Sequence, residues 1–304
     1  MNTPVKSDTA RAASLMVLST LSFALMTICV RLASQTLPVM ETAFWRNLAG
    51  FLVVLPFVWN AHGRIPRTSQ FGKYIFRCVI GLASMFCIFW SVANLPLAQA
   101  ISISYSSALF ATVAAALFLG EAVRVRRWSA VIVGFIGVLI LVRPFSHTFE
   151  IGTLVAVLAA LLSAAVSIQI KQLTKIDDPY TVVFWTYLLW VFMSFVPAAM
   201  DWHWPSGITW LWIALLGLFG TGGQLLWTKA MQLGEVSALS PISFLQLPIV
   251  TLLGWLWFNE HVDGYTLFGA AIILGSNFYI AHRESRLARE SRSEKPTQNV
   301  PPAG

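Results

Sequence analysis

Apolar residues in this chain fall into runs of about 20 residues, separated by turn residues or by short groups of charges. A run of that length, coiled as an α-helix, crosses the hydrocarbon layer of a membrane. The pattern therefore predicts an all-α integral membrane protein with ten transmembrane helices. They are expected at residues 12–31, 39–59, 74–94, 98–119, 127–143, 151–172, 180–200, 208–231, 236–258 and 264–281.

The composition supports a protein surrounded by lipid. The 304 residues are 57% hydrophobic and 11% charged, with a mean hydropathy of +0.71. A soluble domain carries about 25% charged residues, and no soluble core of this length could bury so much apolar surface. The lipid bilayer is thus an expected partner. The first apolar run follows Lys6 and Arg11 and lacks a small-x-small cleavage site, so it is interpreted as a retained span rather than a signal peptide.

Two stretches far apart in the chain share one plan. Residues 98–121 and 240–260 each begin with polar residues, continue as an apolar body and end at a glutamate, Glu121 and Glu260. Another apolar, glycine-containing run follows each copy. Two related halves within one hydrophobic chain are typical of transporters built from internal repeats. We therefore expect two repeats of five helices each.

The positive charges predict an orientation. Of the 20 Lys and Arg residues, 17 fall on the side of the expected spans that also holds both chain ends. Positive residues gather in cytoplasmic segments, so both termini are expected in the cytoplasm. An odd number of spans per half means that the second repeat is inverted relative to the first. The expected organisation is a cytoplasmic N-terminus (1–11), a first repeat (12–145), a second repeat (150–281) and a partly disordered cytoplasmic tail (282–304).

Signatures of enzymes and metal sites are absent from the sequence. There is no GxxxxGK phosphate loop, and the five histidines fall in expected loops or at span edges without an HExxH pairing. The three cysteines lie inside apolar runs without a CxxC spacing and are interpreted as small core residues. We expect no catalytic activity, no metal and no cofactor. The net charge of +7 is dispersed in short clusters between spans, so nucleic acid is not an expected partner.

Polar residues interrupt the fourth and ninth expected spans. Tyr105 and Ser106 lie within a serine-rich run in the fourth span, and Gln246 lies between two prolines in the ninth. Polar groups at this depth need partners that lipid cannot supply, so they are expected to face other helices or a water-filled cavity. Two interpretations remain: hydrogen bonds between packed helices, or the wall of a substrate cavity. Recurrence in both halves favours the cavity.

Three further residues are candidates for substrate binding. Trp90 and Trp227 occupy matching places near span ends, where a tryptophan either stacks on a substrate or anchors the protein at the membrane interface. Arg46 lies about 12 Å into the second expected span at 1.5 Å per residue. It either anchors the structure, for example by pairing with Glu41, or binds a substrate carboxylate. The candidate substrate-binding residues are Tyr105, Ser106, Trp90, Gln246, Trp227 and Arg46.

The glutamates that end the two repeated stretches face an unfavourable helix dipole. A carboxylate at a helix C-terminus is destabilised by the partial negative charge there. Glu121 has Arg124 three residues later as a compensating charge, whereas Glu260 is followed only by His261 and Asp263. We interpret both glutamates as hydrated turn residues in contact with an adjacent helix end. A role in proton coupling is the alternative.

The chain resembles the EamA-type ten-helix transporters of the drug/metabolite transporter superfamily. The resemblance rests on FLGE at residues 118–121, FNE at 258–260, the glycine-containing span after each, and FWRN at 44–47. It covers roughly residues 12–281. It implies a central cavity between two inverted five-helix halves, alternating access, and export of small metabolites such as amino acids. Members often have a proline in the polar run of the fourth span, where this chain has Tyr105-Ser106-Ser107 instead, so the first half's pocket wall is expected to differ.

The predicted function is that of an inner-membrane secondary transporter. It is expected to export a small metabolite, either an amino acid or an amino-acid-derived compound such as a metallophore, without hydrolysing ATP. The alternatives are an importer of a metabolite or a nucleoside-like compound, and an intramembrane enzyme. An enzyme would need a buried nucleophile and base, and the expected spans contain no histidine.

Overall fold

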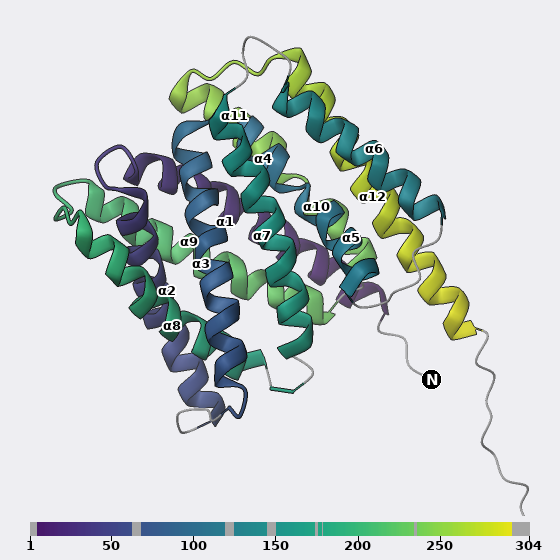
Figure 1. Ribbon diagram of the computed structural model, residues 1–304. Helices are drawn as coiled ribbons and strands as arrows, with labels where there is room; N and C mark the ends of the chain where they lie inside the picture. The colour runs from purple at the N-terminus through teal and green to yellow at the C-terminus, as the bar shows by residue number, and fades with distance from the viewer. Residues whose placement is uncertain are drawn as a thin grey trace, which may run out of the picture.

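The structure is a computed structural model that describes residues 5–62, 68–118, 125–144, 150–173, 176–177, 179–233 and 236–293. These residues form twelve α-helices and no strand (Figure 1). In chain order the helices are α1 (Val5–Ala33), α2 (Val39–His62), α3 (Phe71–Asn94), α4 (Leu97–Ser104), α5 (Ser107–Phe118), α6 (Val125–Val142), α7 (Ile151–Leu173), α8 (Pro179–Met200), α9 (Thr209–Leu233), α10 (Val236–Ser243), α11 (Gln246–Phe258) and α12 (Gly264–Ser293).

Most of these helices are suited to a membrane. Within the described residues, eight segments are long and apolar enough to cross a bilayer, and a shorter apolar helix covers Trp128–Val142. The all-helical membrane fold expected from the sequence is thus confirmed. The count of ten spans and the inverted relation of the two halves stay predictions. The fourth and ninth expected spans are each divided, into α4 and α5 and into α10 and α11.

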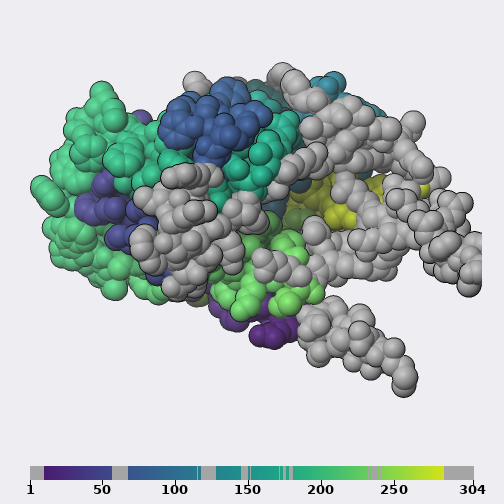
Figure 2. All heavy atoms as spheres, turned by 90° about the horizontal axis from the view of Figure 1, so that it is seen from below, coloured from purple at the N-terminus to yellow at the C-terminus, as the bar shows by residue number. Residues whose placement is uncertain are grey.

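The two halves of the chain pack against each other along several helix pairs. α1 lies along α9, α2 along α8, α3 along α7 and α6 along α12 (Figure 1). Figure 2 shows the molecule from below, with the green surface of α8 and α9 on the left and the yellow of α12 on the right. The largest cluster of buried apolar residues draws on α1, α3, α4, α9 and α11. The break regions of α4–α5 and α10–α11 therefore lie where the two halves meet.

Large apolar side chains cover much of the outer surface. Phe192 and Val196 of α8 are each 66% exposed, and Leu218 of α9 and Phe268 of α12 are similarly uncovered. An apolar surface of this extent would aggregate in water, whereas lipid chains solvate it. The exposed faces of α8, α9 and α12 are therefore the lipid-facing surface.

Two glycines let α6 and α12 approach closely. A Cβ atom added at Gly269 would lie 2.9 Å from the carbonyl oxygen of Gly137, and one added at Gly137 would lie 3.0 Å from the carbonyl oxygen of Gly269. Small residues at a helix crossing bring the backbones together in membranes, where packing rather than hydrophobic burial drives association.

Gly269→Ala is expected to lower the free energy of unfolding by about 1–3 kcal/mol, because the added methyl group meets backbone atoms that cannot rotate away. Thermal unfolding of the purified protein in detergent measures this loss. Gly275→Ala on the same helix is the matched control, since its Cβ would meet nothing within 4 Å. Equal destabilisation by both substitutions would contradict the close-packing interpretation.

Candidate functional site

Two helix breaks define the candidate site. α4 ends at Ser104 and α5 begins at Ser107, while α10 ends at Ser243 and α11 begins at Gln246. The chain does not unwind at either break. Its hydrogen bonds shorten from the fourth to the third preceding residue, with Ser106 N donating to the Ile103 carbonyl and Leu247 N to the Phe244 carbonyl. Short 3₁₀ turns inside a helix often mark functional hinges.

The local sequence explains the first break. The hydroxyls of Ser104 and Ser106 donate to the carbonyl oxygens of Ile101 and Ile103, at 2.7 and 2.6 Å. Serine side chains that bond to nearby carbonyls compete with the regular helical pattern. The serine-rich run is therefore a cause of the break as well as a set of polar groups within it.

Proline explains the second break. Pro248 has no N–H to donate to the Phe244 carbonyl four residues earlier, and that carbonyl accepts from Leu247 N at 3.1 Å instead. Pro241 lies within α10, the short helix before the break. The two halves thus interrupt corresponding helices by different chemistry, serine in one and proline in the other.

Tyr105 joins the two breaks directly. Its hydroxyl donates to the carbonyl oxygen of Ser243 at 2.9 Å. Its ring meets that of Phe244 edge to face, with the centroids 5.4 Å apart. Its own carbonyl accepts a hydrogen bond from Asn277 Nδ2 of α12 at 2.9 Å. The Tyr105 side chain therefore joins the first break to the end of α10 and to Phe244 in the second break, and its backbone carbonyl joins the first break to α12.

The other predicted binding residues are spread more widely. Ser106 is fully buried, and Gln246 is half-buried at the start of α11. Trp90 packs on α7, where a Cβ at Gly152 would lie 2.6 Å from its ring, and Trp227 on α9 is 38% exposed. Within the part of the chain that the structure describes, no hydrogen bond or ring contact joins Trp90, Trp227 or Arg46 to Tyr105.

Arg46 does not pair with Glu41. The Glu41 carboxylate instead accepts from Trp45 Nε1 at 3.0 Å and from His203 N at 2.9 Å. Arg46 donates to Asn47 Oδ1 at 3.2 Å. The pairing considered from the sequence is therefore not formed, because the turn before α9 takes the second carboxylate oxygen of Glu41.

Glu260 lies at a second junction of the two halves, which the sequence does not predict. Asn259 adopts a left-handed conformation (φ 52°) that ends α11, and Glu260 N then donates to the Gly254 carbonyl. This turn directs the Glu260 carboxylate toward the first residue of α4, where Oε2 accepts from Leu97 N at 2.7 Å. The expected contact with an adjacent helix end is thus formed. Glu121 lies outside the described residues.

Arg31 completes this junction. Its guanidinium donates to Glu260 Oε1 at 3.0 Å and to the carbonyls of Val92 and Leu95 at 2.6 and 2.9 Å. The cation lies at the C-terminus of α3 and the carboxylate at the N-terminus of α4, so each charge is favoured by a helix dipole. We call this set of contacts the Arg31–Glu260 network. Sequence pattern offers no means to pair two residues 229 positions apart.

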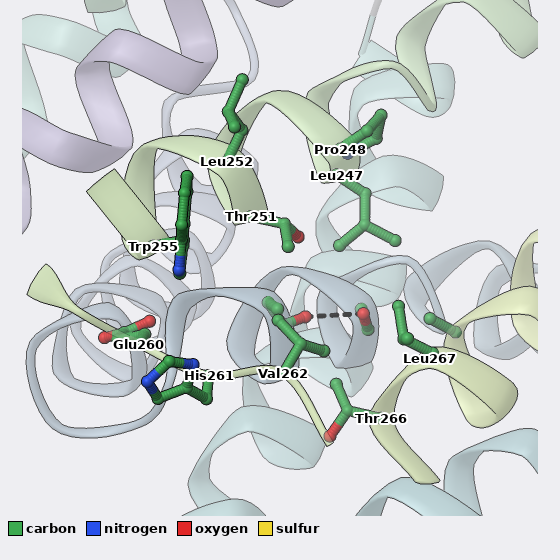
Figure 3. A pocket seen from close by; sticks show the side chains of 13 residues that line it. Leu247, Pro248, Thr251, Leu252, Trp255, Glu260, His261, Val262, Thr266 and Leu267 are labelled. Atoms are coloured by element: carbon green, nitrogen blue, oxygen red, sulfur yellow. Dashed lines mark hydrogen bonds between the residues drawn. The ribbon is translucent and has the colours of Figure 1, made fainter. Parts of the chain in front are cut away.

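Two cavities adjoin the Arg31–Glu260 network. The larger, of about 440 Å³, lies between α4, α11, α12 and the turn that carries Glu260. Figure 3 shows Leu247, Thr251 and Trp255 of α11 facing Val262, Thr266 and Leu267 across it. A smaller and more polar cavity of about 200 Å³ includes Gln99, Arg143, Glu150 and Asp263. Arg143 forms an ion pair with Asp263 there and lies over the ring of Tyr265.

The family assignment follows from comparison with known proteins. The model of the EamA-like transporter family matches residues 10–143 and again residues 150–281. The chain belongs to the EamA-like transporter family. The membership expected from the FLGE and FNE motifs is confirmed, and the chain is a multi-pass membrane transporter of a small molecule.

The relatives of this EamA-like transporter are named for different transported compounds. A riboflavin transporter of Vibrio cholerae is 31% identical over 295 residues, covering 95% of this chain and 99% of the relative. An S-adenosylmethionine uptake transporter of Rickettsia felis is 29% identical, covering 84% and 87%. The pseudopaline exporter CntI of Pseudomonas aeruginosa is 27% identical, covering 86% and 92%. Uptake and export both occur among these names, so they do not decide direction.

A solved structure supports the same fold. It aligns with a TM-score of 0.61 at 19% sequence identity, covering 93% of this chain and 99% of the other.

Proposed function

We propose that this chain is a secondary transporter of the inner membrane that carries a small polar metabolite by alternating access. The observation that supports this most is the contact between the two helix breaks, Tyr105 hydroxyl to Ser243 carbonyl. Interrupted helices in corresponding places of two halves are the usual location of a transporter's cargo site. In this proposal the first repeat (12–145) and the second repeat (150–281) are inverted relative to each other and rock about the breaks.

The contact between the breaks is weak enough to open during transport. A neutral hydrogen bond contributes about 0.5–1.5 kcal/mol and an edge-to-face ring pair a similar amount. Separation of the two breaks would free the Tyr105 hydroxyl, and Gln246 is the first residue of α11 after the second break. Tyr105, Ser106 and Gln246 are the proposed hydrogen-bonding groups for the cargo, and Trp90 and Trp227 the proposed aromatic walls.

The Arg31–Glu260 network fits a gate at one end of this pathway. It joins α1, α3 and α4 of the first half to the end of α11 in the second half. In this proposal both termini are cytoplasmic, as the positive-inside rule predicts, and the network is then on the outer side of the membrane. We propose that the described conformation is closed on the outer side and that the network separates when the transporter opens outward.

Two cargo classes fit the relatives. Export of an amino-acid-derived compound, expected from the sequence, agrees with the name of the pseudopaline exporter. Transport of a ring-bearing vitamin or nucleoside-like compound agrees with the names of the riboflavin and S-adenosylmethionine transporters. The proposed aromatic walls suit the second class, and the polar break residues suit both.

Counterflow in proteoliposomes tests the proposal. Liposomes loaded with unlabelled riboflavin, S-adenosylmethionine or a mixture of amino acids are diluted into the matching labelled compound. We expect one class to exchange at least tenfold faster than in protein-free liposomes, without ATP. The direction of net flux down a gradient, with the protein inserted in a known orientation, then separates exporter from importer. Exchange that required ATP, or that no member of the panel elicited, would contradict the proposal.

A further inference from the structure

Two arginines approach one tryptophan at membrane depth. Trp190 lies halfway along α8, and the guanidinium carbons of Arg46 on α2 and Arg77 on α3 lie 6.0 and 5.9 Å from its ring centre. Arg46 also lies 5.3 Å from the ring centre of Tyr187. Counted along their helices, Arg46 and Arg77 are each about 10 Å inside a helix end. We call these four residues the arginine–tryptophan cluster.

The aromatic part of the cluster is held rigidly. Trp190 Nε1 donates to the Cys78 carbonyl of α3 at 3.1 Å. A Cβ at Gly81 would lie 2.8 Å from the indole, and one at Gly50 would lie 2.3 Å from the Tyr187 ring. The absence of a side chain at each glycine therefore provides the space that the ring occupies. The rings cannot move away from the cations without disturbing α2 and α3.

Among the described residues, the groups that contact these two cations are neutral. Arg77 is 6% exposed, donates to Thr186 Oγ1, and leaves its Nε without a hydrogen-bond partner. Arg46 is half-buried and donates to Asn47 Oδ1, which is itself fully buried. Throughout the described ranges of the chain, no carboxylate lies within ion-pair distance of either guanidinium.

Such an arrangement is unfavourable without an anion. A single arginine near the centre of a membrane helix costs about 2.5–3.5 kcal/mol by insertion measurements, and two close cations also repel each other. Each cation–π contact stabilises the arrangement by about 0.5–2 kcal/mol but does not neutralise the positive charge. An intramembrane cation without a carboxylate partner is therefore most simply explained by an anionic ligand that binds and dissociates.

We infer that the arginine–tryptophan cluster binds an anionic group, a carboxylate or a phosphate, carried by the transported molecule. This inference rests on the proposed transport function. Arg46 makes the contact, because it is half-buried and lies beside Gly220 of α9, where a Cβ would lie 3.7 Å from its Nε. A guanidinium presents paired donors that match either anion. Arg77, which is buried, supplies a second positive charge and helps to hold Trp190 in place.

The inference divides the candidate cargoes by charge. A cargo with a carboxylate, such as an amino-acid-derived compound, gains from the cluster. A cargo with a net positive charge is repelled by it. A neutral ring compound gains only ring contacts, whereas its phosphorylated form gains the charge interaction as well.

Matched pairs of probes test the inference by equilibrium binding to the purified protein in detergent. Riboflavin and flavin mononucleotide share a ring system and differ by a phosphate. N-acetyltryptophanamide and N-acetyltryptophan differ by a carboxylate. In at least one pair we expect the anion to bind at least tenfold more tightly than its neutral partner, with a margin that shrinks as salt is raised. The pair that shows the preference identifies the anion as phosphate or carboxylate.

Variants connect the preference to the cluster. Arg46→Gln is expected to abolish the preference, Arg46→Lys to retain part of it, and Arg77→Gln to reduce it. Arg11→Gln, which removes an exposed charge at the start of α1, is the matched control and should keep the full preference. Melting temperatures of all variants show whether a loss reflects unfolding.

Three results would overturn the inference. These are equal binding of neutral and anionic members in both pairs, a preference that survives Arg46→Gln, and binding of none of the four probes. The proposed transport function is tested separately, by the counterflow experiment. Counterflow of a neutral cargo that Arg46→Gln leaves unchanged would retain the transporter and remove the anion site.

Discussion

Glu260→Ala is expected to lower the free energy of unfolding by about 2–4 kcal/mol, the largest stability loss expected from any single side chain in the break or gate regions. The Glu260 and Arg31 side chains are only 15% and 19% exposed, so water compensates poorly for a lost partner. Without the carboxylate, Leu97 N–H at the start of α4 loses its acceptor and the Arg31 cation loses its counter-ion. Chemical denaturation in detergent measures the loss.

The control for this prediction is a second ion pair at the same end of the bundle. Asp263 pairs with Arg143 and caps α12 through Thr266 N, but its side chain is 45% exposed. Asp263→Ala is therefore expected to cost about 1 kcal/mol, mostly from the lost cap. A cycle of Arg31→Ala, Glu260→Ala and the double variant isolates the coupling between the pair. Two results would contradict a stabilising role for the Arg31–Glu260 network. One is that the losses of unfolding free energy in the cycle are additive, and the other is that the Glu260 variant is as stable as the Asp263 variant.

The sequence predicts part of the Arg31–Glu260 network but not the pairing of the two residues. Arg31 ends the first expected span, Glu260 follows the ninth, and the sequence predicts a helix-end contact for Glu260. The partner could not be predicted, because it depends on how α1 packs relative to the end of α11. That packing is fixed by many side chains across both halves rather than by a local motif.

The sequence predicts the positions of the two helix breaks better than it predicts their conformation. The serines around Tyr105 and the prolines around Gln246 marked the correct stretches, because polar groups and missing N–H donors disturb a membrane helix wherever they occur. The apolar pattern nevertheless predicts each stretch as one continuous span. A two-residue 3₁₀ turn leaves the hydrophobic length unchanged, so the apolar run alone does not reveal it.

The arginine–tryptophan cluster was missed for a different reason. The positive-inside interpretation treats the lysines and arginines near span ends, Arg77 among the 17, as charges that reach water. The structure buries it against Thr186 and Trp190 of α8. The signal in the sequence is a positive charge at the fourth residue of the expected span 74–94, with no acidic residue on the same helix.

Tyr105→Phe is expected to reduce exchange of the cargo about five- to tenfold while the amount of protein in the membrane stays nearly unchanged. The substitution removes one hydroxyl and keeps the ring that meets Phe244. A hydrogen bond lost from the bound cargo is worth about 0.5–1.5 kcal/mol, which corresponds to a reduction of up to about tenfold. Gln246→Leu keeps the approximate volume and removes the amide, and it is expected to give a loss of similar size. Tyr279→Phe on α12, where the tyrosine is 44% exposed, is the matched control and should leave exchange unchanged.

The comparison of exchange with abundance separates the two roles open to these residues. In the described conformation the Tyr105 hydroxyl holds the Ser243 carbonyl, so a purely structural role is a real alternative. If Tyr105 only joins the two breaks, its loss would lower the melting temperature and the membrane abundance in step with exchange. If Tyr105 and Gln246 bind cargo, exchange falls while both of those measurements hold, and the affinity for cargo falls with it. Unchanged exchange in both variants would remove the break region as the binding site, because a polar group in contact with the cargo cannot be deleted without weakening its binding.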